Sequence, residues 1–280
     1  MEDERLSLGM DRLLAPDWVP PEVDTTRAHP ARIYEYLLGG KHYFDIDREA
    51  AEVALRHVPQ GRAMAQENRA FLRRAVRFLA AEGIDQFLDV GSGLPGTGNI
   101  GDFAREVLPE SRIVYVDYDP IVAVHGRALL GNSDADRTAV VLADVRQPES
   151  ILEDAEVRRV IDFDRPVAVL MAALLHFVSA AEDPARIVAT FVDAMAPGSA
   201  LVLTHLTDGG HPEQAANARK AWDSATSQMH VRTPPEIEAL FAGTELVEPG
   251  LVARPLWRPD GEVRDDWETI WGLAGVGIKR

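Results

Sequence analysis

Residues 87–96 decide the fold and read Phe87-Leu88-Asp89-Val90-Gly91-Ser92-Gly93-Leu94-Pro95-Gly96. The stretch begins as an apolar run and then enters a turn with two closely spaced glycines. Glycine permits a tight turn and lets a ligand lie against the backbone. Ordinary strand-to-helix loops also use turn glycines, so this turn alone does not distinguish a loop from a ligand site.

Three aspartates follow successive apolar runs. Asp89 lies at the tip of the first run, Asp117 closes the second, and Asp144 closes the third. The carboxyl ends of parallel strands are where α/β sheets bind ligands. A carboxylate after the second strand can accept both hydroxyls of a ribose, one after the third can accept an adenine amino group, and one beside the glycine turn can hold a cationic amino group. Each can also be a helix N-cap, a role that Asp119 fits better than Asp117 does.

Short apolar runs alternate with helical stretches from residue 86 onward. The runs lack in–out alternation, which is typical of strands buried on both faces. Such strand-helix alternation predicts a parallel sheet with right-handed crossovers and helices on both faces. The predicted strands are Phe87–Val90, Ile113–Val116, Val140–Ala143, Val167–Met171 and Ala200–Thr204, and helices are expected near residues 98–108, 120–130, 147–157 and 182–195.

The two ends of the chain differ from this alternating region. Residues 1–29 predict a polar arm, residues 30–62 a separate helical segment, and residues 63–280 the main α/β domain. Helices are predicted over Ala31–Leu38, from the N-cap Asp47 to before Pro59, and from about Gln66 to Glu82. Near the C-terminus we expect helices at 212–228 and 234–241, then an edge hairpin from Leu246–Arg254 and Gly272–Ile278.

Composition excludes several classes of function. The 280 residues include 29 basic and 45 acidic side chains, a formal net charge of −16, which repels polyanions and argues against general nucleic-acid binding. Cysteine is absent, which excludes disulfides and thiol chemistry. No histidine spacing suggests a metal site, so none is predicted. Without a signal core or a spanning apolar run, the expected location is the cytoplasm with no membrane partner. The oligomeric state stays open.

The glycine turn and its aspartates resemble the class I methyltransferase fold. More closely, the chain resembles a bacterial S-adenosyl methyltransferase family formerly classed as a domain of unknown function. This likeness covers nearly the whole chain beyond residue 28. The segments that carry it are Ala31-Arg32-Ile33-Tyr34-Glu35-Tyr36-Leu37-Leu38-Gly39-Gly40-Lys41, Asn68-Arg69-Ala70-Phe71-Leu72, residues 86–95 and Val169-Leu170-Met171-Ala172-Ala173-Leu174-Leu175-His176-Phe177.

The resemblance implies a Rossmann-like, mostly parallel, seven-stranded sheet that ends in an antiparallel hairpin, with an N-terminal helical lid. It also implies S-adenosylmethionine as the cofactor, with Asp117 on the ribose and Asp144 on the adenine edge. Asn68 and Arg69 open the helix before the first strand and can reach the methionine carboxylate. The predicted cofactor-binding residues are Asn68, Arg69, Asp89, Gly91, Ser92, Gly93, Asp117, Tyr118, Asp144 and Val145.

Two other functions fit parts of the sequence. An NAD(P)-dependent oxidoreductase is the first, because residues 91–96 match G-x-G-x-x-G and Asp117 follows at a suitable distance for a ribose. Against it, Pro95 delays the following helix, and Asp89 would repel a pyrophosphate. The second is a protein that binds S-adenosylmethionine without catalysis.

The acceptor is expected to be a small molecule, and the sequence identifies neither it nor the atom that is methylated. His176 ends the fourth strand region, where the transferable methyl should face the acceptor, and imidazole can act as a base near neutral pH. It can equally be a hydrogen-bonded structural histidine. His205 is a weaker candidate for contact with the acceptor, and Tyr34 and Tyr43 are predicted to wall the acceptor pocket.

Overall fold

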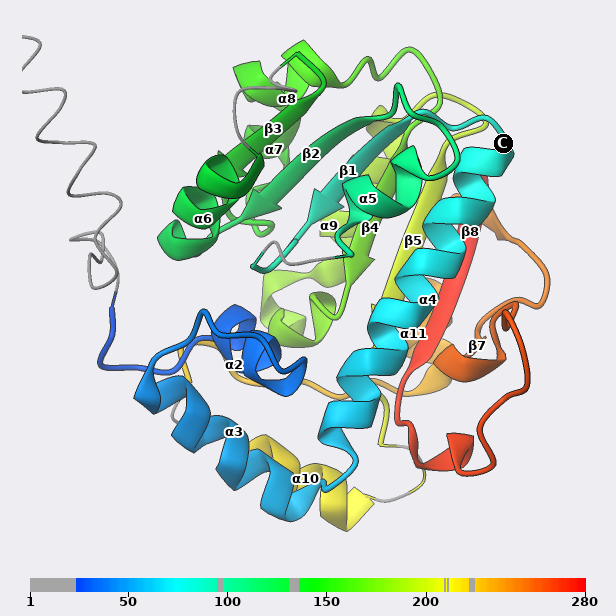
Figure 1. The fold of residues 1–280 in the computed structure, drawn as a ribbon. Coiled ribbons are helices and arrows are strands. Elements are labelled where there is room, and N and C mark those ends of the chain that lie inside the picture. The colour runs from blue at the N-terminus through cyan, green and yellow to red at the C-terminus, as the bar shows by residue number, and fades with distance from the viewer. Residues whose placement is uncertain (1–23, 95–97, 131–135, 209, 211, 222–224) are drawn as a thin grey trace, which may run out of the picture.

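The protein is described by a computed structural model that covers residues 24–94, 98–130, 136–208, 210, 212–221 and 225–280. A mixed sheet of eight strands runs through its centre, with helices on both faces (Figure 1). Seven strands follow the order β3-β2-β1-β4-β5-β8-β6, and a short β7 pairs with β8 beside this path. This is the α/β architecture that the sequence predicts.

The five predicted apolar runs become the five parallel strands. Each is paired in register with its neighbour, so their carboxyl ends meet at one edge of the sheet. The strands are β1 Gln86–Val90, β2 Arg112–Asp117, β3 Thr138–Leu142, β4 Ala168–Ala172 and β5 Ala200–His205.

The C-terminal strands are antiparallel, as expected, but the predicted continuous strand Leu246–Arg254 is wrong. It is replaced by β6 Thr244–Leu246 and β7 Val252–Ala253, which both pair with β8 Leu273–Lys279. A turn separates the two short strands, because the Gly250 N–H donates to the Val247 carbonyl. β8 lies between β5 and β6, so it is an interior strand of the sheet.

Helices bury both faces of the sheet. Adjacent residues of β1 show this, since Phe87 and Leu88 are both 0% exposed yet belong to different cores. One face is covered by α4 Gly61–Ala81 and α5 Ile100–Arg105. The other is covered by α7 Pro148–Glu153, α8 Ala155–Val160, α9 Pro184–Ala194 and α11 Pro234–Ala239. Burial on both sides explains the strands' uniformly apolar sequences.

Several predicted helices differ in their bounds. α4 begins at Gly61 rather than near Gln66, so Asn68 and Arg69 lie inside it and do not open it. The stretch 147–157 is divided into α7 and α8, because the Asp154 carboxylate caps α8 by accepting the N–H groups of Glu156 and Val157. The expected helix 212–228 is the shorter α10 Pro212–Ala221. By contrast, α6 Pro120–Leu130 has the predicted bounds, and the Asp119 carboxylate accepts the Ile121 N–H at its start.

The N-terminal helices lie across the carboxyl ends of the strands. They are α2 Pro30–Leu37 and α3 Asp45–His57, and α3 packs against α2 and α10 (Figure 1). The prediction of Asp47 as an N-cap is wrong, because α3 begins after Phe44. Asp47 is instead buried and accepts the N–H groups of Phe44 and His29, which joins α3 to the segment before α2.

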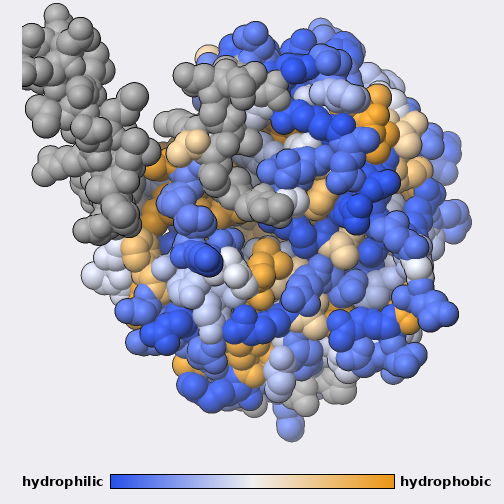
Figure 2. All heavy atoms as spheres, viewed as in Figure 1, coloured by the Kyte–Doolittle hydropathy of each residue, from blue (hydrophilic) through white to orange (hydrophobic). Residues whose placement is uncertain are grey.

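The surface is strongly hydrophilic. Figure 2 shows hydrophilic residues over most of the face drawn, with smaller hydrophobic areas among them. None of the described helices is long and apolar enough to cross a membrane. Across the described ranges, no three acidic or histidine side chains are grouped as metal ligands.

Candidate active site

A cavity lies where the N-terminal helices meet the carboxyl ends of β1, β2, β4 and β5. Its volume is about 210 Å³, many times the roughly 15 Å³ that one water molecule requires. A void of this size is a place for ligands rather than a packing defect. Its polar floor comes from the ends of β1 and β2 and the loops that follow them, which contribute Asp89, Gly91, Ser92, Gly93, Asp117 and Tyr118.

The glycine turn forms the floor of the cavity. Gly91 and Gly93 have φ values of +72° and +66°, which L side chains rarely adopt. A Cβ on Gly91 would also lie 2.6 Å from Leu174 Cδ1. The N–H groups of Gly91 and Ser92 both donate to the Val116 carbonyl, at 2.8 and 3.1 Å.

These N–H groups are therefore engaged, and α5 begins only at Ile100. A dinucleotide site instead places a helix N-terminus directly at the glycine turn, where it meets the pyrophosphate. The turn thus differs from a phosphate cradle, as the position of Pro95 suggests.

Asp117 is fixed at the end of β2. Its Oδ2 accepts the Gly93 N–H at 2.9 Å and its Oδ1 accepts the Asp119 N–H at 3.0 Å. Burial is the main cause that raises the pKa of this carboxyl to about 6, against the hydrogen bonds, which lower it. The side chain lines the cavity in a single held orientation, and each oxygen keeps a further lone pair for a ligand hydroxyl.

Asp89 and Arg69 are a pair of opposite charges on the cavity wall. The Asp89 side chain is only 5% exposed, and no hydrogen bond to it exists within the described part of the chain. Burial raises the pKa of Asp89 to about 7, and the nearby Arg69 charge partly opposes this rise. Arg69 is half-buried, and it makes no ion pair with any residue that the structure describes. Asp89 can therefore accept hydrogen bonds from a ligand, and Arg69 can donate them.

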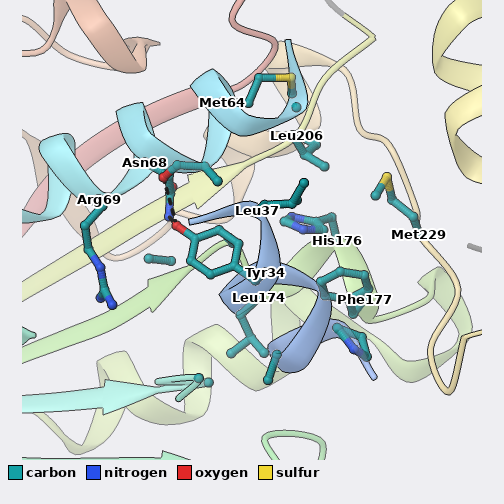
Figure 3. Close-up of a pocket in the computed structure, with 18 of the residues that line it drawn as sticks. Tyr34, Leu37, Met64, Asn68, Arg69, Leu174, His176, Phe177, Leu206 and Met229 are labelled. Atoms are coloured by element: carbon teal, nitrogen blue, oxygen red, sulfur yellow. Dashed lines mark hydrogen bonds between the residues drawn. The ribbon is translucent and has the colours of Figure 1, made fainter. Parts of the chain in front are cut away.

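Asn68 is at the centre of a buried hydrogen-bond chain. It donates to the Tyr34 hydroxyl at 3.0 Å (Figure 3). Its own Oδ1 accepts from the Thr204 hydroxyl at 2.7 Å. The Tyr34 hydroxyl donates to the Ala65 carbonyl, and Thr204 Oγ1 accepts the Ala173 N–H. The chain joins α2, α4, β5 and the loop after β4, so Asn68 and Tyr34 are cavity residues whose side chains are held in place.

His176 and His205 have different environments. His176 is buried on the cavity wall, and its Nδ1 has no hydrogen-bond partner among the described residues. Burial is the main reason that its pKa is well below the usual value, so the imidazole is neutral at pH 7. His205 donates from Nδ1 to the Leu206 carbonyl and accepts at Nε2 from Arg232. It is outside the set of cavity residues, and this pairing suits a structural role.

Other predicted residues also lie off the cavity wall. Asp144 binds the Arg146 guanidinium through both carboxylate oxygens, at 2.6 to 2.9 Å. Val145 packs in the hydrophobic core, and the Tyr43 ring packs edge-on against Tyr36. Tyr118 does line the cavity, with its ring centroid 4.7 Å from that of His29.

The sequence interpretation missed the apolar half of the cavity. In the view of Figure 3, Arg69 lies on one side of Tyr34, and His176, Leu206 and Met229 lie on the other. Arg254 was missed too, although it is an isolated cation within the apolar stretch Leu251–Trp257, which is a visible signal. The further apolar residues of this wall include Leu37, Leu55, Val58, Met64, Val231 and Trp271.

Comparisons with known proteins identify a family. The chain matches the S-adenosyl methyltransferase family over residues 16–280. A candidate methyltransferase of known structure from Thermobifida fusca YX is 47% identical, with a TM-score of 0.88 over 94% of this chain and 99% of that one. A DUF574 family protein from Streptomyces avermitilis MA-4680 is 40% identical, with a TM-score of 0.88 over 92% and 99% of the two chains.

A more distant likeness concerns the fold alone. The pyocyanin biosynthetic protein PhzM is 18% identical, with a TM-score of 0.52 over 89% of this chain and 62% of that one. Comparison with curated proteins finds no match.

The family match covers nearly the whole chain, and it favours the methyltransferase over the oxidoreductase interpretation of the glycine turn. It confirms the predicted class I fold, the predicted enzyme class and the predicted cofactor. This chain belongs to the S-adenosyl methyltransferase family and uses S-adenosylmethionine.

Proposed function

We propose that the enzyme binds S-adenosylmethionine over the Gly91–Gly93 turn and methylates a small molecule held in the apolar half of the same cavity. The observation that carries this proposal is the continuity of the cavity. One space joins the buried carboxylates Asp89 and Asp117 to the apolar wall around Leu206 and Met229. Cofactor and acceptor can therefore be held together in one cavity, which brings the reacting atoms close to each other.

The polar half fits the cofactor. Asp117 would accept the ribose hydroxyls, because its held carboxylate faces the cavity beside Gly93. No Cβ contact would arise within 4 Å at Gly93, so the backbone there is open to a ligand. Asp89 and Arg69 would hold the ammonium and the carboxylate of the methionine part, which supplies the buried Asp89 with a partner.

The adenine edge is the least defined part of this assignment. Asp144 and Val145 stay predictions for it, with Asp144 now bound to Arg146. The Tyr118 ring is on the cavity wall, and Arg146 lies 5.9 Å from it. A modest rearrangement of the Arg146 side chain would free Asp144 for a ligand amino group.

The apolar half suits a small acceptor. When bound, S-adenosylmethionine supplies an electrophilic methyl group on a sulfonium, which a lone pair of the acceptor can attack. We assign His176 as the base that accepts the proton from the acceptor hydroxyl or amine. Its Nδ1 has no hydrogen-bond partner among the described residues, and the ring is neutral. The net charge of −16 on the chain would repel the phosphates of a nucleic-acid strand, which favours a small acceptor.

We also propose that residues 30–62 act as a lid over the catalytic domain, 63–280, with 1–29 as an arm. Residues 1–23 of that arm lie outside the described structure. The lid contributes Tyr34 and Leu37 from α2 and Leu55 from α3 to the cavity wall. A ligand that fills the cavity would contact both parts at once.

The cofactor assignment is tested by two ligands that differ only at the amino-acid end. S-adenosylhomocysteine carries the amino acid, whereas 5′-methylthioadenosine lacks it. In calorimetry, Arg69→Met should raise the dissociation constant of S-adenosylhomocysteine by about tenfold or more and leave that of 5′-methylthioadenosine unchanged. Equal losses for both ligands, or a larger thermal shift with NAD or NADP, would reject the assignment.

The role of His176 is tested by His176→Gln. We expect kcat to fall while the dissociation constant of S-adenosylhomocysteine is kept. Unchanged turnover on an accepted substrate would remove His176 from the chemistry. Binding of S-adenosylhomocysteine without turnover on a broad acceptor panel would instead support a protein that binds the cofactor without catalysis.

A further inference from the structure

Arg254 is a buried arginine on the cavity wall. It begins a short 3₁₀ turn, Arg254–Leu256, directly after β7, and its side chain is almost completely buried. The guanidinium donates from Nη1 to the Met64 carbonyl at 3.2 Å and from Nη2 to the Trp271 carbonyl at 2.5 Å. Both of these residues line the cavity, as Arg254 does, so the guanidinium lies at its wall.

The close approach of this guanidinium to the backbone requires glycine at position 272. The φ of Gly272 is +150°, and a Cβ there would lie 2.4 Å from Arg254 Nη2. The chain therefore makes specific room for the arginine head group rather than only for its aliphatic stem.

No carboxylate neutralises Arg254. Within the described ranges it forms no ion pair, and its Nε has no hydrogen-bond partner. The comparably buried Arg32 differs, since it lies 3.4 Å from Asp119 and 3.7 Å from Asp47. Burial lowers the pKa of Arg254 to about 10, and the more distant Tyr34 and Glu67 offset this only in part.

A buried cation without a counter-charge is costly, typically by several kcal/mol. A neutral donor could bind these two carbonyls equally well. The two hydrogen bonds therefore do not explain why a positively charged side chain is buried at this position. Guanidinium has five N–H donors, and two are used here. The remaining donors fit a planar anion that enters from the cavity.

The cofactor is not the natural source of that anion. Arg69 lies on the opposite side of Tyr34 from His176, Leu206 and Met229 (Figure 3). Arg254 is held by the carbonyls of Met64 and Trp271, which pack with Leu206 in one apolar cluster. Arg254 therefore belongs to the apolar half of the cavity, away from Arg69.

We propose that the methyl acceptor is a carboxylic acid with an apolar, ring-sized body, and that Arg254 binds its carboxylate while Met64, Leu206, Met229 and Trp271 enclose the body. This inference rests on the proposed function of the cavity and names the substrate class. Held in this way, the acid directs its far end, with the hydroxyl or amine to be methylated, toward His176 and the cofactor. Arg254 is accordingly a specificity-determining residue.

The test compares acids with their uncharged amides. Benzoate, 4-hydroxybenzoate and 4-hydroxycinnamate, each beside its carboxamide, are titrated into protein saturated with S-adenosylhomocysteine at pH 7. We expect at least one acid to bind about tenfold or more tightly than its amide. If no acid binds at about 10 mM, or if acids and amides bind alike, the proposal is overturned.

Two variants assign the preference to Arg254. Arg254→Met should abolish the preference for the acid and leave the dissociation constants of S-adenosylhomocysteine and 5′-methylthioadenosine unchanged, whereas Arg254→Lys should keep part of it. Arg69→Met is the matched control, because it should lose affinity for S-adenosylhomocysteine and keep the acid preference. A preference that survives Arg254→Met overturns the proposal, as does a selective loss of S-adenosylhomocysteine affinity in that variant.

The acid–amide comparison on the unaltered protein does not depend on any variant folding. The two proposals also fail separately. Absence of S-adenosylhomocysteine binding contradicts the cofactor site, and its presence without acid preference contradicts only the acceptor class.

Discussion

Replacing Asp89 by asparagine should stabilise the ligand-free protein and weaken cofactor binding at the same time. Burial raises the pKa of Asp89 from an ordinary 3.8 to about 7. Between pH 3.8 and pH 7, the Asp89 carboxyl is therefore protonated in the folded protein but ionised in the unfolded chain. Asp89 therefore favours folding below pH 4, and this contribution is lost as the pH rises to 7.

The expected gain follows from that shift. About three pKa units correspond to about 4 kcal/mol at pH 8, where the folded protein must hold the bare carboxylate. Relaxation of the site will reduce this, so we expect Asp89→Asn to raise the melting temperature by about 5–10 °C at pH 8. At pH 4 or below the two proteins should melt alike.

The ligand responds in the opposite direction. If only the ionised Asp89 binds the ammonium, the ionised fraction falls from about 0.9 at pH 8 to about 0.09 at pH 6. The dissociation constant of S-adenosylhomocysteine should then rise about tenfold over this range. 5′-Methylthioadenosine, which lacks the ammonium, reports the separate titration of Asp117 and is the internal control. In Asp89→Asn the difference between the two ligands should disappear.

Calorimetry and thermal unfolding from pH 4 to pH 8 measure both effects on the same samples. A variant that is less stable than the native protein at pH 8 would show that Asp89 is not a strained carboxylate. A variant that binds S-adenosylhomocysteine with native affinity would show that Asp89 does not hold the amino acid.

Further changes test the parts of the site separately. Asp117→Ala should raise the dissociation constants of S-adenosylhomocysteine and 5′-methylthioadenosine alike, by about 10- to 100-fold in calorimetry, because both ligands carry the ribose. Native affinity for either ligand would show that Asp117 does not bind the ribose. Asn68→Ala breaks the buried bonds to Tyr34 and Thr204 and should lower the free energy of unfolding in urea by about 1–3 kcal/mol. Phe71→Ala, at a fully buried position of α4, should cost about 3–5 kcal/mol in the same assay, and a loss below 1 kcal/mol would contradict the packing described.

The cofactor half of the cavity was predictable because it depends on local rules. Parallel strands place the residues that follow them at one edge, so Asp89 and Asp117 had to lie near each other once the strands were recognised. The glycine turn between them is contiguous in sequence. Asp144 obeys the same rule but is bound by Arg146 two residues later, a local competition that strand register alone does not reveal.

The boundaries that were wrong also have local causes. Asp154 starts a new helix in the middle of a helical stretch because its carboxylate caps the next turn. The Gly250 turn divides the stretch between Val247 and Val252 into two short strands. Asp47 looked like a cap from its sequence position, but its carboxylate accepts backbone N–H groups on both sides of α2.

The acceptor half could not be predicted, because no local pattern brings its residues together. Met64 and Arg254 are 190 positions apart and meet only through a hydrogen bond between α4 and the turn after β7. The apolar stretch around Arg254 is a signal that this arginine is unusual, but the sequence does not show which distant residues enclose it. Because the guanidinium of Arg254 is buried, water no longer neutralises its charge, and the proposed acidic ligand does so instead. Arg254 therefore restricts the acceptor more than any sequence motif of this chain does, because an amide of the same shape would leave the guanidinium without a counter-charge.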